Sequence, residues 1–220
     1  MIRSLILKEL RETWGIAAAA LALYLAEVGG LIGFRVFKLL GTPSANTGLP
    51  FIADSFLWYY VVVSACFAAA LGLWQTLREQ FFGTYLFLLH RPMSVRGIIA
   101  TKVLFGLTMS LACAAIPILL YAAWAATPGS HPGPFVWSMT LPAWKVWLSI
   151  PAIYLAAFLA GFRPARWLGT RLLPCAVVAI VVMLMSVPLQ SLWVAVAFGS
   201  LTLTALVASL YEVVAARDYA

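Results

Sequence analysis

The sequence predicts an all-α integral membrane protein in which an amphipathic N-terminal helix at the membrane interface is followed by six transmembrane helices. The chain is 64% hydrophobic and only 10% charged, and its mean hydropathy is +1.00, whereas soluble domains are about 45–50% apolar and about 25% charged. The net charge is +7, but the basic residues lie singly among apolar residues and form no run or stripe. This scatter indicates a role in membrane orientation and argues against a nucleic-acid partner. We expect residues 1–220 to form a single transmembrane domain.

The first element, residues 1–13, shows apolar positions at helical spacing with charges on the other side. The apolar set is Ile2, Leu5, Ile6, Leu10 and Trp14, and the charged set is Arg3, Lys8, Arg11 and Glu12. Such a pattern is typical of a helix that lies in the plane of the membrane interface. We therefore predict an interfacial helix over 1–13.

Six apolar stretches follow. A helix needs about 20 mainly apolar residues to cross the hydrocarbon core. The stretches with this character cover residues 14–34, 54–76, 98–124, 143–162, 172–187 and 191–214. They predict six transmembrane helices.

The basic residues predict that both termini are cytoplasmic. With the N-terminus inside, the cytoplasmic side receives Arg3, Lys8, Arg11, Arg78, Arg91, Arg96, Lys102, Arg163, Arg166, Arg171 and Arg217. The outer side receives Arg35, Lys38 and Lys145. This strong bias follows the positive-inside rule.

The segment 78–92 joins the second and third stretches on the predicted cytoplasmic side. From Arg78 to His90 the chain spans about 20 Å as a helix, which is too short to cross the membrane. Pro92 lacks a backbone donor and disfavours helical geometry at Arg91. We predict a short surface helix, a corner, and a return into the membrane.

Residues in and after this segment resemble the first cytoplasmic loop of ABC-2 type transporter permeases. In that family a Glu precedes a Gly-Thr pair, a leucine-rich run ends at a Pro, and a small polar residue and an Arg lead to a Lys in the next span. The matching residues are Glu79, Gly83, Thr84, Leu88, Leu89, Arg91, Pro92, Ser94, Arg96 and Lys102. The N-terminal "LILKELRE", the six spans and the ending "VVAARDY" are also similar to the family.

The resemblance implies a permease subunit of an ABC transporter in the inner (plasma) membrane of a prokaryote, where it exports a substrate. The loop would be the coupling helix that docks on a separate ATPase subunit, present in two copies, beside a second permease subunit that is identical or different. The residues implied in this coupling are Arg78, Glu79, Gly83, Thr84, Arg91, Pro92, Arg96 and Lys102. The chain has no G-x-x-x-x-G-K-[ST] phosphate loop, so ATP and Mg²⁺ would be bound by the partner. We expect no catalytic residue, metal ligand or cofactor site in this chain.

Two acidic residues, Glu27 and Asp54, are candidates for a functional site within the membrane. Glu27 lies about 20 Å into the first span, where a carboxylate needs a cavity, a partner or a proton. The functional interpretation makes it part of a substrate path, with Asp54 as a second possible member, or a proton-sensitive latch. The structural interpretation is a contact with a Ser, Tyr or Trp of a neighbouring span, or a side chain that extends toward Arg35. Asp54 also suits the N-cap of the second span. An intramembrane enzyme and a non-transporting scaffold for a partner complex are the alternative functions.

Overall fold

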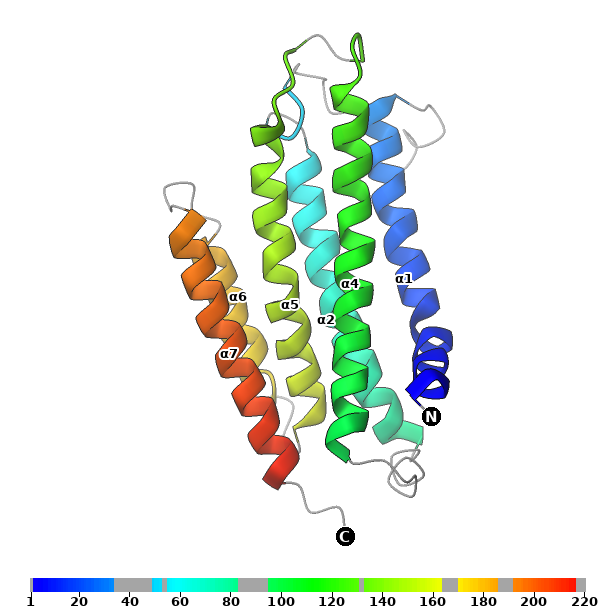
Figure 1. Ribbon diagram of the computed structural model, residues 1–220, viewed down its shortest axis with the longest axis vertical. Coiled ribbons are helices and arrows are strands. Elements are labelled where there is room, and N and C mark those ends of the chain that lie inside the picture. The colour runs from blue at the N-terminus through cyan, green and yellow to red at the C-terminus, as the bar shows by residue number, and fades with distance from the viewer. Residues whose placement is uncertain are drawn as a thin grey trace.

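The computed structural model describes residues 2–33, 49–52, 55–82, 95–130, 133–163, 170–185 and 192–216. This part of the chain is 90% helical and contains no strand, which confirms the all-α fold class. The helices are elongated and run alternately up and down the long axis of the molecule (Figure 1). The N-terminus of α1 and the C-terminal end of α7 therefore lie at the same end, which we call the N-terminal end of the bundle.

Each predicted apolar stretch corresponds to one helix, but the first helix begins 12 residues before its stretch and the second continues 6 residues beyond its stretch. They are α1 (Ile2–Ile32), α2 (Phe56–Phe82), α4 (Val95–Ala126), α5 (Leu141–Phe162), α6 (Leu173–Met185) and α7 (Leu192–Ala216), with a short 3-10 helix η2 (Trp137–Thr140) before α5. Within the described residues, five helices are long and apolar enough to cross a membrane. The exception is α6, whose 13 residues span only about 20 Å. The structure thus supports a multi-pass membrane protein without confirming the count of six spans.

α1 is one continuous helix of 31 residues. It has no break after residue 13, where a separate interfacial helix was predicted to end. Leu5, Glu9 and Thr13, each one turn apart, are buried against the bundle. Trp14 is exposed. The N-terminal turns of α1 are therefore packed into the helical bundle, and their placement in a membrane interface stays a prediction.

Four helices, α1, α2, α4 and α5, form the core, with α6 and α7 packed on the other side of α5. The contact between α2 and α5 is the most extensive and depends on glycine. A Cβ on Gly72 would lie 2.6 Å from the carbonyl oxygen of Tyr154 and 2.9 Å from the amide nitrogen of Phe158. Small residues at such positions let two helix backbones approach closely, which is how helices associate where water provides no driving force.

The C-terminal end of α5 is held by Arg171, which precedes α6. Its Nε donates to the carbonyl of Ala160 at 2.9 Å, and its Nη2 donates to the carbonyl of Gly161 at 2.8 Å. The last carbonyls of a helix have no partner within the helix. Arg171 satisfies two of them and so fixes where the chain leaves α5 for α6.

Candidate functional site

The residues implied in ATPase coupling divide into those that the structure describes and those that it does not. Gly83, Thr84, Arg91 and Pro92 lie outside the described residues, as does Asp54 of the possible substrate path. Glu79 lies in the last turn of α2. Arg78, Arg96 and Lys102 are described with their side chains.

Arg78 and Arg96 lie at the N-terminal end of the bundle and each faces an aromatic ring. The Arg78 guanidinium lies 5.9 Å from the ring centroid of Trp74, one turn earlier in α2. The Arg96 guanidinium, in the first turn of α4, lies 5.0 Å from the ring of Tyr211 in α7. Cation–π contacts at exposed sites contribute about 0.5–1 kcal/mol each. Arg96 thereby links the start of α4 to α7.

Lys102 is buried in the bundle and does not lie on its surface. Its ammonium forms an ion pair of 2.8 Å with Glu9 of α1, and the two side chains are only 4% and 1% exposed. A buried charge without a partner is strongly unfavourable. The pair therefore fixes α1 against α4 at this depth. Because Lys102 is covered, it cannot touch a docked partner in this conformation.

Two further side chains extend the ion pair into a network. The Gln75 Nε2 of α2 donates to the second carboxylate oxygen of Glu9 at 3.1 Å. The Tyr154 hydroxyl of α5 donates to the Gln75 Oε1 at 2.6 Å. An ionised carboxylate only accepts hydrogen bonds, so Glu9 requires the amide nitrogen of Gln75, and the amide oxygen is left to accept from Tyr154. We call these four residues, Glu9, Gln75, Lys102 and Tyr154, the polar clasp.

The polar clasp takes one residue from each core helix at the same depth. Glu9 and Lys102 each lie seven residues after the first residue of their helix, and Gln75 lies seven residues before the last residue of α2. This places the clasp about 10 Å from the N-terminal end. Gly106, one turn above Lys102, leaves the space for it, since a Cβ there would lie 2.6 Å from the Gln75 Oε1 and would overlap the Tyr154 hydroxyl.

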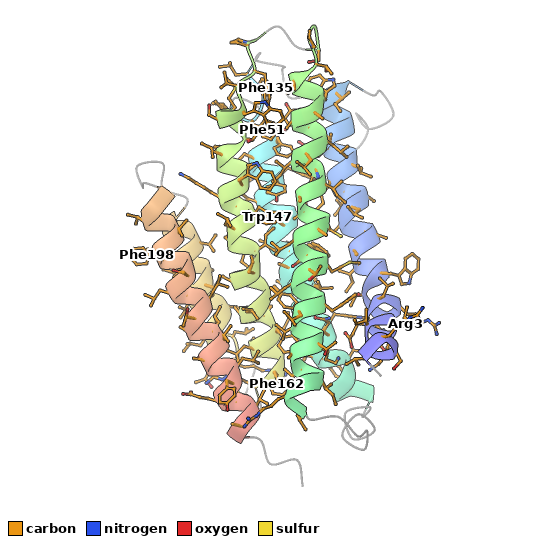
Figure 2. The ribbon with its side chains drawn as sticks, viewed as in Figure 1. Arg3, Phe51, Phe135, Trp147, Phe162 and Phe198 are labelled. Carbon is orange, nitrogen blue, oxygen red and sulfur yellow. The ribbon has the colours of Figure 1, made fainter. Side chains whose placement is uncertain are left out.

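The opposite end of the bundle holds Glu27 and an aromatic cluster. The Ser55 hydroxyl, just before α2, donates to the Glu27 Oε1 at 2.8 Å. A contact with a serine of a neighbouring span is one of the structural explanations that the sequence offers for Glu27. Rings of Phe51, Phe56 and Tyr121 pack against one another with centroids 4.7–5.0 Å apart. Figure 2 shows Phe51 at this end and Arg3 at the other. Glu27 and the polar clasp are thus separated by most of the length of α1.

Sequence reasoning missed Glu9, Gln75 and Tyr154. A usable signal was present only for Lys102, because a lysine inside the third apolar stretch needs a partner of opposite charge. In the described ranges, no group of three or more His, Cys, Asp or Glu side chains could hold a metal ion.

Comparisons with models of protein families, with curated proteins and with solved structures gave no significant match to this chain.

Proposed function

We propose that this chain is the membrane-spanning permease subunit of an ABC transporter of the ABC-2 type, and that it exports a substrate with energy from a separate ATPase subunit. The ATPase would dock on the connection between α2 and α4, which carries the residues that resemble the family's coupling loop. ATP and Mg²⁺ would be bound by the ATPase, because this chain has no phosphate-binding loop of the P-loop type.

The observation that carries the proposal is the position of the polar clasp. The C-terminal end of α2, the N-terminal end of α4 and the N-terminus of α1 lie at one end of the bundle. Lys102, seven residues into α4, is bonded there to Glu9, which in turn holds Gln75. A force applied to the connection between α2 and α4 would therefore reach all four core helices directly.

The distribution of charge supports cytoplasmic termini. The described basic residues near the N-terminal end include Arg3, Arg11, Arg78, Arg96 and Arg163, whereas Lys145 lies at the start of α5 near the opposite end. This asymmetry is what the positive-inside rule expects of the cytoplasmic side. We infer that the N-terminal end faces the cytoplasm and that the chain belongs to the plasma (inner) membrane of a prokaryote.

The apolar outer faces of the bundle fit a membrane setting with a second permease subunit. Phe198 points outward from α7 (Figure 2), and Leu201 and Val207 on the same helix are also exposed. Lipid chains or an apolar face of the second subunit would cover such residues. Two permease subunits, identical or different, would then bring two coupling segments to two ATPase copies.

Docking is tested by capture of the ATPase with matched charge reversals. The tagged chain is purified in a mild detergent from its native cells as wild type, as Glu79→Arg and as Glu212→Arg. Glu212 is an exposed acid near the end of α7, at the same end of the bundle, so its reversal controls for the change in charge. We expect an active ATPase with the wild type and with Glu212→Arg, and its loss from a folded Glu79→Arg protein. No nucleotide-binding partner on any of the three, or equal capture by all three, would refute docking at this connection.

A further inference from the structure

The polar clasp places an ion pair inside a bundle whose buried residues are mostly apolar. Replacing a buried ion pair by well-packed apolar side chains of similar size is often neutral or stabilising. Stability alone therefore does not account for Glu9 and Lys102. What apolar packing lacks, and this ion pair has, is the ability to be hydrated when the two helices separate. The pair can be buried together or hydrated together, but removing the partner of either charge while the other stays buried is strongly unfavourable.

Toward the N-terminal end, the buried apolar contact between α1 and α4 is separate from the main core, while the Trp74 Nε1 of α2 donates to the Glu12 carbonyl of α1 at 3.2 Å. The apolar contact is a small cluster formed by Leu5 and Ile98. Both lie one turn below the ion pair on their helices. Separating α1 from α4 at this end would thus expose one apolar cluster and hydrate one ion pair about 10 Å from the helix ends.

The other half of the clasp, Gln75 and Tyr154, joins two helices that pack closely against each other. Gln75 and Tyr154 are joined by a hydrogen bond of 2.6 Å, and their helices approach closely at Gly72. Gly161 adds to this contact, because a Cβ there would overlap the Thr76 hydroxyl of α2. Helices α2 and α5 are therefore held closely together at the level of the clasp by backbone packing and by a side-chain hydrogen bond.

We propose that the polar clasp is a two-state latch: it is closed in this structure, and it opens when α1 separates from α4 and water reaches Glu9 and Lys102 together. As a part of the transport cycle the latch rests on the proposed function, since the force that opens it would come from the docked ATPase. The latch itself is a property of this chain and can be tested without a partner.

The test measures the maleimide labelling rate of single cysteines in the purified full chain. The native Cys66, Cys113 and Cys175 are first replaced by alanine. Thr13→Cys reports opening, because Thr13 is fully buried one turn above Glu9. Ser110→Cys is the matched control, because Ser110 is also fully buried but lies two turns above Lys102, deeper in the bundle. Both replacements change only an oxygen for a sulfur, with a methyl lost at position 13.

Two variants hold the latch in opposite states. Lys102→Met leaves the Glu9 carboxylate without its countercharge, so we expect labelling at position 13 to rise at least about tenfold while position 110 stays protected. Glu9→Leu combined with Lys102→Met gives an apolar contact with no charge to hydrate, so position 13 should stay as protected as in the parent. With a co-purified ATPase, ATP and vanadate should raise labelling at position 13 in the parent and leave the double variant unchanged.

Each outcome decides between a latch and a fixed structural contact. Equal labelling at positions 13 and 110 in Lys102→Met would show general loss of packing and overturn the latch. A double variant that labels like Lys102→Met, or that responds to nucleotide as the parent does, would also overturn it. The charge exchange Glu9→Lys with Lys102→Glu should restore the parent's behaviour, because the Gln75 amide and the Tyr154 hydroxyl can each exchange donor and acceptor roles. If the wild type captures no ATPase, the proposed function fails while the partner-free comparison still decides on the latch.

Discussion

Gly106 provides the sharpest test of the geometry of the polar clasp. A Cβ at this position would lie 2.6 Å from the Gln75 Oε1 and would overlap both the hydroxyl and the ring carbon of Tyr154 that carries it. A carbon and an oxygen in close contact are normally about 3.3–3.6 Å apart. Gly106→Ala must therefore displace Gln75 by a large part of an ångström and Tyr154 by more, and neither has room because both are buried.

The expected effect is a net loss of stability. Overpacking of a filled core costs about 1–3 kcal/mol, and weakening the hydrogen bond between Tyr154 and Gln75 adds about 0.5–1.5 kcal/mol. The better helix propensity of alanine offsets about 0.5–1 kcal/mol. We therefore expect Gly106→Ala to lower the free energy of unfolding by about 0.5–4 kcal/mol, with a central value of about 2 kcal/mol, measured by denaturation in mixed detergent micelles.

A matched glycine gives the opposite sign. Gly30 also lies within a helix, α1, but nothing would come within 4 Å of a Cβ there, so Gly30→Ala should be neutral or slightly stabilising. Tyr154→Phe should make Gly106→Ala less harmful, because it removes the hydroxyl that the methyl group would overlap. If Gly106→Ala and Gly30→Ala have the same effect on stability, the described arrangement of Gln75 and Tyr154 around Gly106 is wrong.

Three other substitutions test the remaining contacts by the same denaturation assay. Gly72→Ala should destabilise the protein by about 2 kcal/mol or more, because its methyl group meets α5 backbone atoms that cannot rotate away. An effect as small as that of Gly30→Ala would argue against close α2–α5 packing. Ser55→Ala should lower stability by only about 0.5–1.5 kcal/mol, because Glu27 is partly exposed and water can replace the lost donor. If the variant still captures the ATPase as the wild type does, this contact has no part in coupling. Arg171→Leu should lower stability by about 2–4 kcal/mol, since two α5 carbonyls lose a charged donor. Arg171→Lys should restore only part of this loss, because one ammonium lacks the planar fork of arginine. Full rescue by lysine would contradict the bridging geometry.

The helices could be predicted from the sequence because hydrophobic length is a local property. Apolar stretches near 54–76, 98–124 and 143–162 correspond to α2, α4 and α5. The stretch 172–187 was apolar enough to predict a span, but the helix that the structure describes there is α6, with 13 residues. Composition records how apolar a segment is, and it does not fix where a helix begins and ends.

The polar clasp could not be predicted in the same way because it depends on which helices are neighbours. Glu9 falls in a segment predicted to lie at the interface, where a carboxylate can be hydrated and needs no partner, so the sequence does not mark it as part of a site. Lys102 is predicted from the sequence as one of the cytoplasmic basic residues, and the family resemblance implies a role in coupling, but neither identifies Glu9 as its partner inside the bundle. Gln75 is polar but uncharged and could have faced a neighbouring helix anywhere.

Glu27 shows an intermediate case. Its depth in the first apolar stretch indicated that it needs a partner or a cavity, and a serine on a neighbouring span was among the partners considered. The structure supplies Ser55. The sequence could predict the need for a partner from the cost of burying a carboxylate, but only the packing of α1 against α2 could identify it.

The most direct test of the proposed function is the mass of the intact complex. The tagged chain would be extracted from its native membrane into a mild detergent and measured by native mass spectrometry with ATP and vanadate present. We predict a complex with two permease subunits, at least one of them this chain, and two copies of a nucleotide-binding ATPase subunit. A stable, folded chain that appears alone, or only with partners that bind no nucleotide, would contradict a permease function.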